Sequence, residues 1–201
     1  MNTGTKFVWL LLLLFTSVNA VESQNSGKYL KGAVPLVDGK VVFADTITSK
    51  KSRAEIKALV EKWVAMRFNS NVPTNRQILS DTTQNLLVYQ CSDSLIFKKA
   101  LLVLDYTTLS YKLYIQIEDG RCIASLRYLR YAYPVKDEVE RYNAEELITD
   151  DTALSSDGKK LLRAYKNFRV FTIDYKDNLF KSLRKQLKKK QLVEEEDEWQ
   201  E

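Results

Sequence analysis

The chain has 201 residues, with 31 Lys or Arg, 26 Asp or Glu and no histidine, which gives a formal net charge of +5. The absence of histidine excludes Ser-His-Asp and Cys-His nucleophilic sites, histidine-ligated metal and imidazole acid–base chemistry. The two cysteines, Cys91 and Cys122, provide too few thiolates for a structural zinc site. We therefore expect no metal ion and no cofactor.

Residues 1–20 have the three parts of a secretory signal peptide: the basic Lys6, an apolar run over 7–15, and small residues ending at Ala20. The run is shorter than the about 20 apolar residues that a transmembrane helix needs. The sequence predicts cleavage after Ala20 and export to the periplasm or the exterior. We expect no transmembrane anchor, and export excludes nucleic acid as a partner.

Domain organisation follows from length and composition. We expect residues 21–28 to be a flexible N-terminal segment, because they are polar and lie at the start of the mature chain. Residues 29–190 have the usual size of one domain. Residues 191–201 carry a block of Glu and Asp and are predicted to be an acidic tail.

The first ordered element is predicted to be a hairpin over residues 33–43. Two short β-like stretches flank Asp38 and Gly39, which both tolerate the positive φ of a tight turn. Pro35 cannot donate a ladder hydrogen bond, so this arm belongs at the edge of a sheet.

A helix is predicted to begin after Ser52 and to continue to about Asn69. Ser52 and Glu55 have the spacing of a capping box, in which each side chain satisfies a backbone amide of the other residue. One apolar stripe suits this helix to covering a sheet, with Trp63 as its anchor. The stripe consists of Ile56, Leu59, Val60, Trp63 and Val64.

The middle of the chain changes from helical to twofold periodicity. Apolar and polar residues alternate most clearly between Tyr111 and Glu118, which is typical of a strand with one buried face. Asp119-Gly120 then predicts a tight turn, so the strands on either side should pair antiparallel in a meander. The strand-like segments are residues 86–89, 95–97, 111–118 and 121–133.

Helical spacing returns in the last third of the chain. Asn143 is positioned to cap a short helix through Ile148, and a long helix is predicted to begin near Lys159. Its stripe is Leu161, Tyr165, Phe168, Thr172, Tyr175, Leu179, Leu183 and Leu187. The predicted fold is α+β: an antiparallel meander with two main helices packed on one face.

A set of short segments occurs in a recognisable order. The segments are residues 29–35, 37–43, 118–122, 130–133, 145–150, 168–169, 172–174 and 179–180. The set resembles an exported bacterial family of unknown function, the domain of unknown function 4468 family, which has a TATA-binding-protein-like fold. The resemblance implies the same sheet with two helices on one face and assigns no catalytic residue. A shared fold does not by itself imply DNA binding.

One stretch alternates cationic and aromatic side chains and is the candidate partner-binding surface. It could stack a sugar, a peptide or an anion, or its members could be ordinary cross-strand pairs on a sheet face. The candidate residues are Arg127, Tyr128, Arg130, Tyr131 and Tyr133, with Tyr111 and Tyr114 on the neighbouring strand.

Cys91 and Cys122 are predicted to be buried free thiols. Export permits a disulfide, but strands that flank a common strand place their residues roughly 10 Å apart. That distance exceeds the usual Cα separation of a disulfide, near ~7 Å.

Two carboxylate pairs, Asp174 with Asp177 and Glu145 with Glu146, have the composition of an acid–base pair. Neither pair has a nucleophile or a Gly-rich frame near it in the sequence, so helix-surface and capping roles are preferred.

The function expected from these features is a non-enzymatic binding or interaction module of the bacterial cell envelope. Its partner would be an envelope protein or an apolar or glycan ligand, held on the sheet or between sheet and helices. One alternative is an enzyme of carboxylate or Tyr/Lys type acting on envelope material. Another is a structural subunit that assembles through the strand edge at 34–43.

Overall fold

The computed structural model describes residues 27–68, 75–101 and 103–189. The predicted signal peptide, most of the N-terminal segment and the acidic tail lie outside these ranges. The helices are η1 (Gly27–Tyr29), α1 (Arg53–Arg67), α2 (Ala144–Leu147), α3 (Asp150–Ala153) and α4 (Lys166–Leu187). The strands are β1 (Leu36–Val37), β2 (Lys40–Val41), β3 (Phe43–Thr48), β4 (Arg76–Asp81), β5 (Leu86–Ala100), β6 (Val103–Glu118), β7 (Arg121–Val135) and β8 (Glu138–Asn143).

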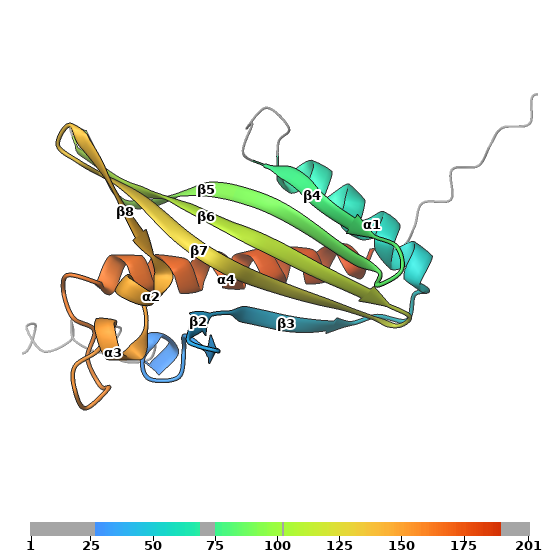
Figure 1. The fold of residues 1–201 in the computed structure, drawn as a ribbon, viewed down its shortest axis with the longest axis horizontal. Coiled ribbons are helices and arrows are strands. Elements are labelled where there is room, and N and C mark those ends of the chain that lie inside the picture. Colours follow the sequence, from blue (N-terminus) through green and yellow to red (C-terminus); the bar gives the residue numbers. More distant parts are fainter. Residues whose placement is uncertain (1–26, 69–74, 102, 190–201) are drawn as a thin grey trace, which may run out of the picture.

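The main sheet is antiparallel, with the strand order β3-β7-β6-β5-β4 and with β8 also paired to β7. The predicted meander is confirmed for β4 to β7, whereas β3 crosses over through α1 and joins at the far side, beside β7 (Figure 1). β3 pairs with the first half of β7 and β8 with the second half. These two strands therefore share one edge of β7.

The long hairpins follow the sequence pattern with one difference. Glu118 pairs with Arg121 across the predicted Asp119-Gly120 turn, where Gly120 has φ 76°. The segments 86–89 and 95–97 were expected to be separate strands, but they are parts of the single strand β5. Ser92, Asp93 and Ser94 keep the ladder intact because they pair with β6 through their backbones.

Both predicted N-cap residues stand directly before a helix. The Ser52 hydroxyl accepts from the Glu55 amide while the Glu55 carboxylate accepts from the Ser52 amide, so α1 begins with a complete capping box. Asn143 precedes α2, and its backbone amide donates to the Glu146 carboxylate at 2.6 Å. The Asp38-Gly39 turn closes the β1–β2 hairpin with both residues at positive φ.

The last helix begins later than its stripe predicts. α4 begins at Lys166, not near Lys159. Leu161 instead forms a bridge with Leu154, and Gly158 has φ 70°, so this segment folds back on itself as a turn. The backbone hydrogen bonds of this turn take the place of those in the first predicted turns of the helix.

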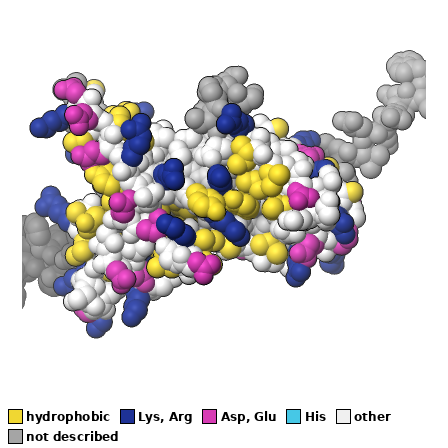
Figure 2. Space-filling model, in the orientation of Figure 1, with side chains coloured by type: hydrophobic (Ala, Val, Ile, Leu, Met, Phe, Trp, Pro, Cys, Tyr) yellow, Lys and Arg dark blue, Asp and Glu magenta, His cyan; other side chains and the backbone are white. Residues whose placement is uncertain are grey.

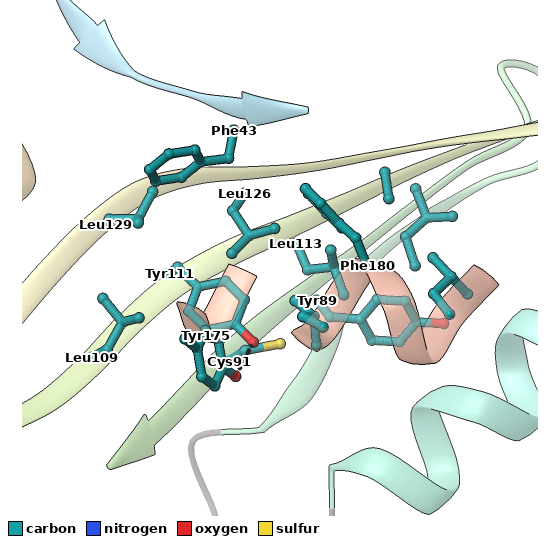
Figure 3. Packing of buried hydrophobic residues seen from close by; sticks show 14 of the residues in the cluster. Phe43, Tyr89, Cys91, Leu109, Tyr111, Leu113, Leu126, Leu129, Tyr175 and Phe180 are labelled. Atoms are coloured by element: carbon teal, nitrogen blue, oxygen red, sulfur yellow. Dashed lines mark hydrogen bonds between the residues drawn. The ribbon is translucent and has the colours of Figure 1, made fainter. Parts of the chain in front are cut away.

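Both long helices pack on one face of the sheet, and the core lies between them and the strands (Figure 3). Odd-numbered residues of β6 from Leu109 to Ile117 face this core and are buried. Trp63 is 4% exposed and its indole N–H donates to the Ser182 hydroxyl of α4 at 3.0 Å, which joins the two helices. The prediction that Trp63 anchors the helix is thus confirmed.

Arg169 of α4 is the largest fully buried side chain of the described residues. Its guanidinium donates to the backbone carbonyls of Tyr29, Leu30 and Ile148 and forms an ion pair with Asp150 at 2.7 Å. Burying a cation is costly unless it is paired and hydrogen-bonded, and this site satisfies both conditions. Arg169 therefore ties the start of the domain to the α2–α3 region.

Cys91 and Cys122 are buried free thiols, as predicted. Cys91 lies opposite Tyr111 and Cys122 opposite Ile117, so they differ by six positions along β6. At ~3.3 Å per residue this offset alone separates them by about 20 Å, twice the predicted distance. Burial raises the pKa of both thiols to about 12.

Candidate functional site

The second face of the sheet, here called the open face, has no helix over it in the described part of the chain. In Figure 1 the strands lie in front of α1 and α4, so Figure 2 shows the open face. Over its middle, hydrophobic side chains (yellow) lie next to Lys and Arg side chains (dark blue). These residues project from β5, β6 and β7 away from the core.

A β-bulge in β7 shapes the open face. The register with β6 shifts between Ser110 and Lys112, so Tyr128 and Leu129 both lie opposite Tyr111. Tyr128 has φ 57°, a left-handed conformation that is strained for a side chain with Cβ. The extra residue leaves Arg127, Tyr128 and Arg130 all exposed, where strict alternation would have turned one of them inward.

Four side chains form what we call the cation–aromatic row: Lys112, Tyr128, Tyr114 and Arg127. Lys112 Nζ lies 5.1 Å from the centre of the Tyr128 ring, and Arg127 Cζ lies 4.8 Å from the centre of the Tyr114 ring. The two rings are 6.5 Å apart and tilted by 41°. Partial burial raises the pKa of Tyr114, which further favours the uncharged phenol. The row is a preformed surface of flat rings and fixed cations.

A groove of about 550 Å³ lies beside this row, and we call it the open-face groove. Three cations line it, Lys112, Arg130 and Arg141, and the ring of Tyr128 forms one wall. Among the described residues, none that lines the groove is acidic, and none of these cations has an ion-pair partner. Its other lining residues are Gln90, Ser110, Tyr131, Ala132, Tyr142 and Asn143.

The structure divides the predicted partner-binding surface between the two faces. Arg127, Tyr128, Arg130 and Tyr114 lie together on the open face, where a partner has access to them. The structure therefore supports these four residues of the predicted surface as accessible to a partner.

The predicted surface is wrong for three tyrosines, because their side chains project toward the helices and not onto the open face. They are Tyr111, Tyr131 and Tyr133. Tyr111 is fully buried with its hydroxyl 2.7 Å from that of Tyr175, and Tyr131 is 1% exposed with its hydroxyl 2.7 Å from that of Thr172. Tyr133 is half-buried, and its hydroxyl donates to the Asp105 carboxylate at 3.0 Å. Tyr111 and Tyr114 are three positions apart in one strand and therefore face opposite sides.

Sequence reasoning missed two cations of the groove, Lys112 and Arg141. The position of Lys112 could have been predicted, because it is an outward-facing residue of the alternating strand that contains Tyr114. Arg141 lies on β8, where Ala132 is its partner in the β7 register. Its position beside Arg130 follows from this pairing, for which the sequence contains no clear pattern.

A second hollow of about 380 Å³ lies between the start of α1 and the β4–β5 hairpin. Its walls include Leu87 and Ile117, and its polar groups are largely bound to one another. Arg53 donates to the Asp119 carboxylate through its backbone amide at 2.8 Å and through its guanidinium at 3.0 Å. This hollow therefore offers few free polar groups to orient a ligand.

The two carboxylate pairs have structural partners. Asp174 and Asp177 both bind the ammonium of Lys28, at 2.6 and 2.8 Å. Glu145 accepts from the backbone amide of Val41 at 2.8 Å, and Glu146 accepts from the Asn143 amide. In the described residues no three Cys, Asp or Glu side chains cluster in a way that could hold a metal ion.

Comparison with known proteins places this geometry in a family. The family model for a domain of unknown function with TBP-like fold, DUF4468, matches residues 43–132. The crystal structure of a DUF4468 family protein from Bacteroides ovatus is 32% identical with a TM-score of 0.75, and the match covers 82% of this chain and 96% of that chain. The chain belongs to the DUF4468 family. The segments that suggested this family in the sequence therefore identified it correctly.

The second solved structure shows the fold alone. A TBP-like protein from Parabacteroides distasonis is 20% identical with a TM-score of 0.63, and the match covers 77% of this chain and 96% of that chain. A search of curated proteins finds no match. For this DUF4468 protein the comparisons thus give the family and the TBP-like α+β fold, and neither carries an activity.

No helix in the described part of this DUF4468 protein has both the length and the apolar content of a membrane span.

Proposed function

We propose that this DUF4468 protein is an exported, non-enzymatic binding module of the cell envelope that holds its ligand on the open face of the sheet. The observation that carries the proposal is the cation–aromatic row beside a groove whose cations have no ion-pair partner among the described residues. None of these side chains is needed to complete the core. Surface residues arranged as a fixed set beside a hollow are typical of recognition.

Three further features support the proposal. Residues 1–20 have the pattern of an export signal, so the ligand would be met outside the cytoplasm. Tyr128 is held at positive φ while the residue is 57% exposed, and strained residues on a surface tend to occur at functional sites. The carboxylate pairs that an enzyme would have used are occupied by Lys28 and by backbone amides.

Native mass spectrometry tests the proposal. The mature protein would be purified gently from its own cell envelope and compared with the same chain expressed in an unrelated host. We expect extra mass on the first sample alone. The variant Tyr128→Gly would lose that mass, because it removes the ring from the open face while allowing the backbone conformation of the bulge.

Two results would contradict the proposal. A bare protein in both samples would argue against a bound partner. Turnover of an envelope polymer by the purified chain, abolished by substituting one of its carboxylates, would argue against a non-enzymatic role. A matched control is Tyr106→Gly, since Tyr106 is a residue of β6 outside both the row and the groove.

A further inference from the structure

The side chains of the open-face groove indicate the chemistry of its ligand. Three cations converge on one hollow from three strands: Lys112 from β6, Arg130 from β7 and Arg141 from β8. β7 pairs with both of the other strands, and Lys112 and Arg141 each lie one strand and two residues from Arg130 in the register, a backbone separation of roughly 8 Å. Like charges gathered without acidic partners repel one another, and this repulsion is relieved when an anion binds.

We infer that the open-face groove binds a saccharide that carries carboxylate or phosphate groups. This inference rests on the proposed function and names its ligand class. Guanidinium groups match carboxylate and phosphate oxygens with pairs of parallel hydrogen bonds, which places the anionic groups at Arg130 and Arg141. Lys112 adds a third positive charge at the wall formed by Tyr128.

The remaining lining residues favour a sugar over an acidic peptide. Gln90, Ser110 and Asn143 line the groove with amide and hydroxyl groups. Each makes a hydrogen bond within the protein and keeps further donor or acceptor capacity for the hydroxyls of a ligand, and the Tyr128 ring offers a stacking surface. The groove is in the middle of a sheet face, where β6 and β7 are already paired with neighbours. Where the described strands line the groove, only β8 has an unpaired edge, so a peptide could pair with backbone N–H and C=O groups there but not along β6 or β7.

Binding would be measured by titration calorimetry on the full mature chain. The probes are trigalacturonic acid for carboxylate sugars, fructose bisphosphate for phosphate sugars, maltotriose as a neutral sugar and hexaglutamate as an acidic peptide. We expect one of the two anionic sugars to bind, with an affinity that falls as salt is added. Which one binds distinguishes the carboxylate from the phosphate source.

Substitutions locate the site. Arg130→Gln and Arg141→Gln should each weaken binding about tenfold, because each removes charge-assisted hydrogen bonds. The matched control is Arg121→Gln, an exposed arginine of the same strand as Arg130 that lies outside the groove. All three side chains are exposed, so the variants should fold like the parent chain.

Three results would overturn the inference: equal binding of maltotriose, tighter binding of hexaglutamate than of either anionic sugar, or no binding of any probe. Equal weakening by Arg121→Gln would likewise remove the groove as the site. The proposed function fails separately, if protein from its own envelope carries no extra mass. A ligand found there that is neither anionic nor a sugar would overturn only the inference about ligand class.

Discussion

At the scale of single residues, two side chains are exceptions to the usual patterns of burial and backbone conformation. Arg169 is a cation in the interior, and Tyr128 is a tyrosine with positive φ. The burial of Arg169 is compensated, because three carbonyls and one carboxylate accept hydrogen bonds from it. The contacts of Tyr128 with Lys112 and Tyr114 lie on the exposed face, which is why we associate Tyr128 with function and Arg169 with stability.

Arg169→Gln should lower the free energy of unfolding by about 3 kcal/mol, because Asp150 and the carbonyls lose their shared donor in a buried site. Urea unfolding measures the change. Arg163→Gln, which alters an exposed arginine just before α4, should change it by less than ~0.5 kcal/mol. Equal unfolding midpoints for the two variants would show that the buried Arg169 does not stabilise the fold.

Tyr128→Gly and Tyr128→Ala both remove the ring, so their difference isolates the backbone. Glycine adopts positive φ without strain, whereas alanine keeps the Cβ that opposes it, and we expect the Gly variant to be more stable by about 1 kcal/mol. Thermal or urea unfolding of the pair measures this difference. If the Ala variant were the more stable, β7 would have no left-handed residue at the bulge in solution.

At the scale of elements, the local signals are strongest at the ends of helices and at turns. Ser52 completes the capping box of α1, and the same helix end is held by the Asp119 carboxylate, which accepts from Arg53. The start of α1 is therefore joined to the β6–β7 turn. Loss of the cap should loosen the contact between helix and sheet as well as the helix itself.

Ser52→Ala should destabilise the protein by about 1 kcal/mol, because the Glu55 amide loses its acceptor. The measurement is urea unfolding, with Ser156→Ala in an exposed loop as the control. A conservative replacement, Ser52→Asp, should restore most of the loss, since aspartate caps helices about as well as serine. Failure of Asp to restore stability would indicate that the hydroxyl has a role other than capping.

At the scale of the whole molecule, burial beneath α1 and α4 controls how the core titrates. It raises the pKa of Tyr89 from its usual 10.0 to about 12, and that of Cys91 and Cys122 from 9.0 to about 12. Each of these groups is neutral when protonated, so the folded protein retains protons that the unfolded chain releases. The unfolded state then binds fewer protons, and stability falls as pH rises.

The free energy of unfolding should therefore be insensitive to these groups below about pH 9 and should fall between about 9 and 12. Urea titrations at a series of alkaline pH values measure the decline. The double variant Cys91→Ala with Cys122→Ala should show a shallower decline, because two of the shifted groups are gone. Equal slopes for parent and variant would show that the thiols ionise as freely in the folded protein as in the unfolded chain.

Periodicity and capping residues were enough to predict the α+β class, the Asp38-Gly39 and Asp119-Gly120 turns, and the start of α1. These features depend on neighbours in the sequence: on the backbone freedom of glycine, on a capping side chain three residues away, and on alternation along a strand. The same locality explains why the family could be recognised from ordered short segments.

Only the tertiary structure decided which tyrosines face a ligand and which face the core. The bulge at Tyr128 shifts the alternation of β7 by one residue, so Tyr131 and Tyr133 face the helices while Tyr128 and Arg130 face outward. Arg141 reaches the groove through strand pairing, and Arg169 finds its acceptors on segments about 20 and 140 residues away. Such contacts arise from chain segments distant in sequence, which a local pattern does not encode.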